Sequence, residues 1–450
     1  MSNFTELLRK KNLSVGIFGI GESNLGVIEY LTHQNSNVII TVRSDTAIGG
    51  IPFKNTNRIF VGEHSLGNID EDILFLSPSV RRDRPEIISA QRRGTLILSD
   101  ADLFFEKCST APVVVTGSDG KSSTTHLISQ AFSLSDKQAL PCGNYGKSLC
   151  SLLDKNILPI AELSSFQLNY LKPHSSYAVI TNITPNHLNW HTSLDEYVRA
   201  KMNITEKADN VIFDADSEIA SKNLADRTVF CKTSLFKSYT EMKHLGGCEN
   251  YITYDNGFIL LNGSPIIDVS RAKRKEHYNI RNFMLTAAAC INECKTAAIS
   301  EAITSFSGLE HRAEVVRECN GIKYIDSSID SSPERTLKTL SALDEKPIVI
   351  LGGKGKGLSV DSLATALPRL TRGAVLLGEV GLNIYDLLKE ENAYSFLIAS
   401  DMSDAVEKAI FLSGGSGTII LSPAATSFDS YKNFQERGDD FKRIIRSFKT

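Results

Sequence analysis

The segment VVVTGSDGKSSTTHLI (residues 113–128) decides how the middle of this chain folds. It combines a short apolar strand, a loop with two glycines and the beginning of a helix. Backbone N–H groups of such a loop can close on phosphate oxygens, and the helix N-terminus adds positive potential. A lysine and a serine at the end of the loop can reach the terminal phosphates and ligate Mg²⁺. The segment therefore predicts a nucleoside triphosphate site, with the candidate residues Gly117, Ser118, Asp119, Gly120, Lys121, Ser122 and Ser123.

This loop differs from the common GxxxxGK[ST] form, because only Ser118 and Asp119 stand between its glycines. The alternative interpretation is an ordinary glycine turn with an incidental lysine. We favour the phosphate site, since a strand and a helix flank the loop as phosphate binding requires.

Apolar runs and helical segments alternate along the rest of the chain, as is typical of buried parallel strands in α/β proteins. The pattern predicts three domains. We expect a Rossmann-like N-terminal domain (1–108), a central P-loop mononucleotide-binding α/β domain (109–308) and a Rossmann-like C-terminal domain (309–450). Inside the central domain, residues 251–263 alternate in polarity around Asn256-Gly257, which predicts an antiparallel hairpin.

The composition excludes several classes of function. With 49 Lys+Arg against 52 Asp+Glu among 450 residues, the net charge of −3 provides no general attraction to nucleic acid or to an anionic membrane. The sequence has no long apolar run and no signal-peptide pattern, so we expect a cytoplasmic protein. The eight cysteines form no CxxC pair, which argues against a zinc site or a disulfide framework.

Segments around the phosphate loop resemble motifs of the Mur ligase family. TGSDGKSS is similar to the short phosphate loop of that family, AELSSFQL (161–168) to its ELSSFQL segment, and ITNITPNHLNWH (180–191) to its NxxxDHxD segment. The resemblance implies that Glu162 and His187 bind Mg²⁺ at two sites, together with the Ser122 hydroxyl. YVRAKMNI (197–204) matches the position of a carbamylated lysine, here Lys201, which would orient the metal ions.

Without the resemblance, the same residues have ordinary interpretations. Glu162 could be a solvated charge at a strand end, His187 a hydrogen-bonded loop histidine and Lys201 a surface lysine on an amphipathic helix. Asn186 and Asn189 stand where the family has aspartates, which leaves fewer negative charges near the metals.

Two further segments are similar to the family's nucleotide-binding motifs. EHYNIRNF (276–283) resembles a helix start whose Asn279 and Asn282 point at the adenine of ATP, although both could instead be capping residues. GLEHRAEVV (308–316) implies that Arg312 binds ATP phosphates, a role suited to its permanently charged fork of donors. Asp326 is expected near the ribose.

The C-terminal segment LSPAATSFDSYKNFQERGDDF (421–441) is closest to the glutamate-adding members of the family. The resemblance implies that Ser427 and Phe434 contact the incoming glutamate and that Lys356 lies on the substrate and phosphate side. Ser328 and Asp330 depart from the family pattern, where a lysine and a threonine are usual.

The N-terminal segment VGIFGIGESNLGVIEYL (15–31) superficially suggests a dinucleotide fingerprint. Its second glycine spacing is long, and the strand ending in IITVR (39–43) has no acidic residue to hold a ribose, which argues against NAD. In the family this position binds a uridine diphosphate, so the resemblance implies substrate contacts for Ser23 and Arg43. The segment LSPSVRRDRPEI (76–87) is similar to a loop near the uracil, and Asn144 in GNYGKS matches a residue that contacts the muramoyl group.

The resemblance as a whole implies an ATP-dependent amide-bond ligase that adds D-glutamate to UDP-N-acetylmuramoyl-L-alanine, through an acyl phosphate, in peptidoglycan synthesis. Its partners would be these small molecules and ATP with Mg²⁺, and it would act as a monomer with Lys121, Glu162, His187 and Lys201 as catalytic residues. Three alternatives stay open: another ligase of the same superfamily, a P-loop regulatory protein that hydrolyses ATP slowly, and a nicotinamide-dependent dehydrogenase.

Overall fold

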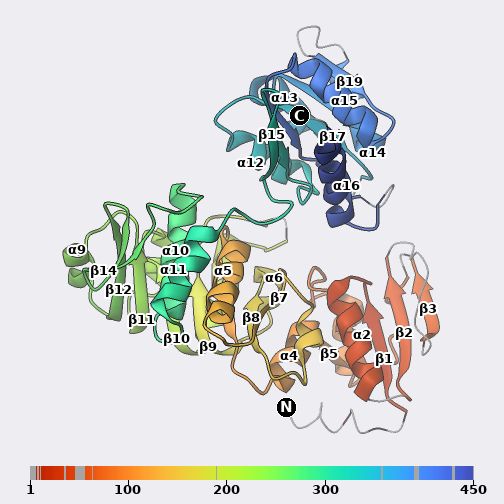
Figure 1. Ribbon diagram of the computed structural model, residues 1–450. Helices are drawn as coiled ribbons and strands as arrows, with labels where there is room; N and C mark the ends of the chain where they lie inside the picture. The colour runs from red at the N-terminus through yellow and green to blue at the C-terminus, as the bar shows by residue number, and fades with distance from the viewer. Residues whose placement is uncertain are drawn as a thin grey trace. The chain divides into compact units, whose positions relative to one another are not determined.

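The computed structural model describes residues 7, 10, 12–34, 37–45, 56–62, 64–188, 190–355, 358–389, 395–427 and 431–448. The chain divides into two compact units, Met1–Phe306 and Ser307–Thr450. Within the described residues it forms three sheets with helices packed against them, which confirms the predicted α/β class (Figure 1). One sheet lies in each of the three expected domains, and the two N-terminal sheets share the first unit.

The N-terminal sheet is parallel, with the strand order β3-β2-β1-β4-β5. Its strands are β1 (Ser14–Phe18), β2 (Ile39–Ser44), β3 (Thr56–Val61), β4 (Ile73–Leu76) and β5 (Leu96–Leu98), and its helices are α2 (Glu22–Gln34), α3 (Pro85–Arg92) and α4 (Asp100–Lys107). The direction of the strand order changes between β1 and β4. In open parallel sheets, ligands bind at such a switch point, beside the loops that follow the two strands.

The central sheet has the order β14-β13-β12-β11-β10-β9-β6-β8-β7. Its strands are β6 (Val113–Thr116), β7 (Ala139–Gly143), β8 (Leu158–Glu162), β9 (His174–Ile180), β10 (Lys207–Asp214), β11 (Val229–Ser234), β12 (Cys248–Asp255), β13 (Phe258–Leu261) and β14 (Ser264–Asp268). It is parallel from β7 to β12 and antiparallel beyond. The pairing of Asp255 with Phe258 confirms the predicted hairpin around Asn256-Gly257.

Helices and helical turns connect the central strands. They are α5 (Lys121–Leu134), η1 (Leu149–Leu152), α6 (Ser165–Leu168), α7 (Leu194–Met202), η2 (Asn203–Thr205), α8 (Glu218–Asn223), α9 (Tyr239–His244), α10 (His277–Cys290) and α11 (Thr296–Ser305). All residues of β6 are buried, because neighbouring strands and the helices on the sheet cover it on every side.

The second unit has its own sheet, in the order β15-β16-β20-β17-β18-β19, with only β15 antiparallel among the described strands. Its strands are β15 (Glu314–Cys319), β16 (Ile322–Asp326), β17 (Ile348–Gly352), β18 (Gly373–Leu377), β19 (Ser395–Ile398) and β20 (Gly417–Leu421). Its helices are α12 (Pro333–Ser341), α13 (Asp361–Leu370), α14 (Gly378–Leu388), α15 (Met402–Ser413) and α16 (Phe434–Ser447). Apolar clusters on both faces of this sheet form its core. No helix in the described ranges is long and apolar enough to cross a bilayer.

A buried ion pair organises the N-terminal domain. Arg43, at the end of β2, and Glu71 both have fully buried side chains and are joined at 2.8 Å. The Arg43 guanidinium also donates to the carbonyl oxygens of Ser65, Gly67 and Asn68. Its N–H groups therefore hold the chain between β3 and β4 in place.

This pair generates a prediction about stability. Glu71→Gln removes the negative charge and leaves the Arg43 charge buried, which we expect to lower the free energy of unfolding by about 3–5 kcal/mol. Denaturant unfolding of the variant and the wild type measures the change. Asp70→Asn is the matched control, because Asp70 is an exposed neighbour whose ion pair with Arg58 lies at the surface. Equal stability of Glu71→Gln and wild type would contradict the role given to the pair.

Candidate nucleotide and metal site

The carboxyl ends of the parallel central strands bring the candidate residues to one edge of the sheet. The phosphate loop follows β6, Glu162 ends β8, and the segment that contains His187 follows β9. Because β6 lies between β8 and β9, all three segments are neighbours at this edge. Strand ends of this kind are the usual place for a ligand in α/β proteins.

The two glycines of the phosphate loop fit positions where other residues would be strained. Gly117 has φ +153°, and a Cβ built on it would lie 1.8 Å from Thr181 Oγ1. Gly120, with φ +78°, would place a Cβ 2.3 Å from Asn282 Oδ1. The loop is thus pressed against the segment after β9 on one side and against α10 on the other.

Two lysines converge on the Gly117 carbonyl oxygen. Lys121 Nζ donates to it at 3.0 Å and to the Ser118 carbonyl at 2.9 Å. Lys201 Nζ donates to the same Gly117 oxygen at 2.6 Å, although Lys201 is only 2% exposed. Burial lowers the pKa of Lys201 well below its usual range, and the nearby Lys121 charge lowers it further, while Glu162 opposes the shift.

Glu162 fits the binding of a hard cation. Its side chain is buried, and Oε2 has no hydrogen-bond partner among the described residues. A buried carboxylate oxygen without a protein donor is well suited to Mg²⁺, which prefers oxygen ligands. The buried Ser122 at the start of α5 offers a further oxygen next to Lys121.

His187 lies in an exposed turn after β9 and has φ +54°, which is uncommon for histidine. The backbone N–H groups of Trp190 and His191 both donate to its carbonyl oxygen. The His187 ring contacts Phe166 of α6 edge to face, with the centroids 5.1 Å apart. Asn189 lies outside the described residues.

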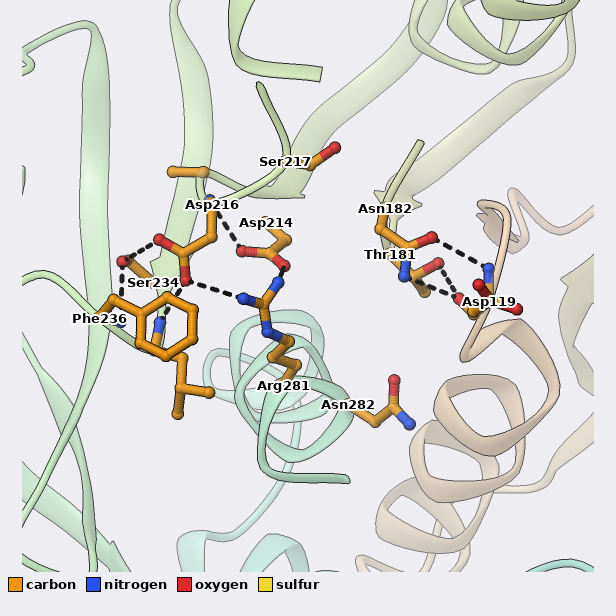
Figure 2. Close-up of polar contacts among 12 residues, drawn as sticks. Asp119, Thr181, Asn182, Asp214, Asp216, Ser217, Ser234, Phe236, Arg281 and Asn282 are labelled. Atoms are coloured by element: carbon orange, nitrogen blue, oxygen red, sulfur yellow. Dashed lines mark hydrogen bonds and ion pairs between the residues drawn. The ribbon is translucent and has the colours of Figure 1, made fainter. Parts of the chain in front are cut away.

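Figure 2 shows polar contacts on both sides of Asn282. On one side, the Asp119 N–H of the phosphate loop donates to Asn182 Oδ1 at 3.0 Å. On the other, Arg281 binds Asp214 Oδ2 at 2.6 Å. Both Asn282 and Asn279 are buried, and Asn279 donates to Glu276.

Sequence reasoning missed the group formed by Arg281, Asp214, Asp216 and Phe236. Arg281 also lies 3.6 Å from Asp216 and its guanidinium carbon is 5.1 Å from the centre of the exposed Phe236 ring. Burial raises the pKa of Asp214 to about 6, and the Arg281 charge opposes this shift. Acidic residues at the end of β10 were the available signal, since strand ends at this edge carry the other candidate residues.

The candidate substrate-binding residues of the first unit, Ser23, Asn144 and Arg43, differ in their burial and in their hydrogen-bond partners. Ser23 lies in the first turn of α2. Burial raises the pKa of Asp100 to about 6, and the interaction with Ser23 opposes this shift. Asn144 is exposed after β7, and its N–H donates to the Glu162 carbonyl, which places it beside the proposed metal ligand. Arg43 is fully buried and bound to Glu71 and loop carbonyls, so this placement does not fit the expected contact with a ligand.

In the second unit, Asp326 is also fully buried. Its oxygens lie 2.7 Å from His311 Nδ1 and accept the Ser328 N–H at 2.8 Å, which does not fit the expected ribose contact. Its neighbour in space, His311, precedes the exposed Arg312 and contacts the Phe434 ring at 6.0 Å. Sequence reasoning missed His311, although it stands next to Arg312.

Ser427 is buried and follows Thr426, which pairs with the backbone of Lys354. The segment 353–355 therefore lies beside the proposed glutamate contact. Lys356 lies outside the described residues.

His311, Glu314 and Asp326 are close enough together to resemble a metal site. The ammonium group of the buried Lys442 is 2.6 Å from Glu314 and 4.0 Å from Asp326. This lysine already supplies the positive charge, so we do not assign a metal ion to the cluster.

Comparison with known proteins identifies a family for the central domain. The Mur ligase middle domain matches residues 115–290, which contain the phosphate loop, Glu162, His187, Lys201 and both asparagines. Among solved structures, the chain resembles a UDP-N-acetylmuramate-alanine ligase from Thermotoga maritima, with a TM-score of 0.60, 21% identity, and coverage of 97% of this chain and 100% of that one. A murein peptide ligase from Psychrobacter arcticus gives a TM-score of 0.54 at 14% identity, with the same coverage. These two likenesses concern the fold.

Curated relatives match over their full length. The chain is 35% identical to a protein of Ruminiclostridium cellulolyticum over 100% of both chains, and 33% identical to one of Acetivibrio thermocellus over 97% of both. The chain belongs to the Mur ligase family. Both relatives are named UDP-N-acetylmuramoylalanine--D-glutamate ligase, as is a Clostridium tetani protein that is 32% identical over 97% of both chains.

The packing of Gly117 generates a prediction about nucleotide binding. Gly117→Ala forces a methyl group against Thr181 and moves the carbonyl that Lys121 and Lys201 share, so we expect ATP binding to weaken at least about tenfold. Fluorescence titration with a labelled ATP analogue measures the affinity. Gly21→Ala is the control, because a Cβ at Gly21 meets no atom within 4 Å. Unchanged affinity in a folded Gly117→Ala protein would rule out the proposed loop geometry.

Proposed function

We propose that the protein uses ATP to join D-glutamate to UDP-N-acetylmuramoyl-L-alanine, in a cytoplasmic step of peptidoglycan synthesis. The observation that carries this proposal is the convergence of Lys121 and Lys201 on the Gly117 carbonyl, with the buried Glu162 beside Lys201. Two lysine side chains and a carboxylate around a phosphate loop suit the transfer of a phosphoryl group. The matching full-length relatives carry the name of this activity.

The reaction has two steps. A carboxylate oxygen of the L-alanine residue attacks the γ-phosphorus of ATP, the bond to the β-phosphate oxygen breaks, and ADP leaves with its electron pair. The amino nitrogen of D-glutamate then attacks the acyl carbon, loses a proton and displaces inorganic phosphate. The first step replaces the carboxylate oxygen, a poor leaving group, with phosphate, a good one. Catalysis of phosphoryl transfer depends mainly on positioning the reactants and neutralising charge.

The first unit contributes the phosphate chemistry. The backbone N–H groups from Gly120 to Ser123, at the start of α5, bind phosphate oxygens, and Lys121 turns from the loop carbonyls to the terminal phosphates. Glu162, His187 and the Ser122 hydroxyl would hold Mg²⁺, which supplies charge neutralisation on the transferred phosphoryl group. Asn279 and Asn282 orient the adenine, and the Arg281–Phe236 pair forms a wall beside it. Ser23 and Asn144 bind the sugar nucleotide.

The second unit contributes the amino-acid chemistry. Ser427 and Phe434 contact D-glutamate, Lys356 supplies positive charge for the substrate and Arg312 binds ATP phosphate oxygens. His311, fixed by Asp326, holds the turn that carries Arg312.

Release of ADP by the purified protein tests the proposal. The assay contains Mg²⁺, ATP and UDP-N-acetylmuramoyl-L-alanine, with D-glutamate, L-glutamate, lysine or no amino acid in parallel. We expect D-glutamate alone to stimulate release. Stimulation by L-glutamate would change the substrate and keep the reaction class. If no amino acid stimulates release from a protein that binds ATP, the ligase proposal fails and a regulatory P-loop protein becomes the better interpretation.

Glu162→Gln gives this assay a matched variant. The amide keeps the size of the side chain but has one oxygen and no charge for Mg²⁺, so we expect release to fall about 100-fold or more. Glu218→Gln, an exposed residue in the first turn of α8, should leave the rate unchanged. Equal rates in the two variants would exclude Glu162 as a metal ligand.

Carbamylation of Lys201 is the second part of the proposal. A lysine adds CO₂ only as a neutral amine, and the buried position of Lys201 favours that form. The product would carry a negative charge beside the metal site. We expect isotope-labelled bicarbonate to give a carbamate signal by NMR in the wild type and none in Lys201→Arg. A wild type without this signal, yet fully active, would show that an unmodified lysine suffices.

A further inference from the structure

The loop after β4 binds the segment after β9 in the central domain through Trp190, the only tryptophan in the sequence. Trp190 Nε1 donates to the Ser79 carbonyl at 2.7 Å, and Arg81 Nη1 donates to the Trp190 carbonyl at 2.8 Å. The Arg81 guanidinium also lies over the indole ring, 5.0 Å from its centre. This loop follows β4 at the switch point of the N-terminal sheet, where a ligand of that domain is expected.

From Trp190 the contacts continue to His187. The indole stacks on the Phe166 ring with the centroids 4.4 Å apart and the planes at 29°. Phe166 also contacts the His187 ring edge to face at 5.1 Å and the His191 ring at 5.8 Å. Arg81, Trp190, Phe166 and His187 thus form a continuous column, which we call the aromatic clasp.

The backbone of His187 shows why support is needed there. Its φ of +54° is unfavourable for a residue with a Cβ, and such conformations persist only where the surroundings impose them. The turn is closed by Trp190 and His191 N–H groups on the His187 carbonyl. Fixing Trp190 therefore fixes His187.

Arg81 is itself anchored at its other end. It binds Asp83 at 2.8 Å and Glu196 of α7 at 3.3 Å. These partners raise the pKa of Arg81, the Asp83 hydrogen bond most strongly. Since α7 also carries Lys201, one guanidinium connects the loop, Trp190 and the helix of the proposed carbamylated lysine.

A second series of contacts reaches the phosphate loop. The His191 ring packs against Trp190 at 4.7 Å and against Tyr197 at 5.3 Å. The Tyr197 hydroxyl is 2.7 Å from Ser118 Oγ. The position of Trp190 thus bears on the nucleotide site as well as on His187.

We propose that Arg81, Trp190 and Phe166 are positioning residues that place His187 for Mg²⁺ and make its placement depend on the loop after β4. Binding of the sugar nucleotide at that loop then strengthens binding of Mg²⁺ with ATP, and the reverse holds by linkage. The inference rests on the proposed function, which assigns Mg²⁺ to His187 and the sugar nucleotide to the N-terminal domain.

Fluorescence of Trp190 provides a test that needs no turnover. The full chain is titrated with Mg²⁺ in the presence of a non-hydrolysable ATP analogue, with and without UDP-N-acetylmuramoyl-L-alanine. In the wild type we expect the sugar nucleotide to lower the half-saturating Mg²⁺ concentration about tenfold. In Arg81→Ala, which keeps Trp190, we expect the shift to fall below about twofold.

The controls separate positioning from simple loss of structure. Arg92→Ala, an exposed arginine at the end of α3, should keep the wild-type shift. If Arg81→Ala has a lower melting temperature, Arg81→Lys replaces it, because lysine keeps the charge but lacks the planar fork. A full shift in either folded Arg81 variant, or no shift in the wild type, overturns the inference. D-glutamate-dependent ADP release is measured separately. The result therefore distinguishes failure of the inference about the aromatic clasp from failure of the ligase proposal.

Discussion

The proposed site depends on the close contact between the phosphate loop and the segment after β9 at Gly117. A side chain at this position would overlap Thr181 Oγ1, so the loop backbone can lie against the neighbouring segment only with glycine. The same residue presents the carbonyl oxygen to which Lys121 and Lys201 both donate. One backbone position therefore sets both the path of the loop and the place where the two lysine side chains meet. Glu162 reaches this place because β8 pairs directly with β6.

The features that the sequence predicted well are local in the chain. Apolar runs, glycine loops and the Asn256-Gly257 turn each depend on a few consecutive residues, and the α/β class follows from their alternation. The grouping of the phosphate loop, Glu162 and the His187 segment was predictable as well, since parallel strands end at one edge. Resemblance to the Mur ligases added the expected roles of these residues.

The features that sequence reasoning missed depend on partners far away in the chain. Arg43 looked available for a diphosphate, but Glu71, which is 28 residues further on, and three loop carbonyls take up its donors. Arg281 and Asp214, which are 67 residues apart, form an ion pair that no local pattern indicates. Ser328 and Asp330, which differ from the family pattern, are also held by distant partners. Both are buried; Arg437 donates to the Ser328 carbonyl oxygen, and the Ser422 hydroxyl donates to Asp330.

Two kinds of buried charge occur among the described residues. Arg43 with Glu71, and Lys442 with Glu314, are matched pairs whose opposite charges meet at 2.8 and 2.6 Å. In such a pair each charge is neutralised by its partner, so neither group is available to bind a ligand. Lys201 and Glu162 are different, because Lys201 donates to a carbonyl oxygen and Glu162 Oε2 lacks a donor among the described residues. Burial of a lysine and a carboxylate without direct neutralisation costs free energy, and the proposed binding of Mg²⁺ and triphosphate would offset that cost. Asp100 meets the same criterion, because its side chain is buried and Oδ1 also lacks a partner in the described part of the chain, next to Ser23, which we propose binds the sugar nucleotide.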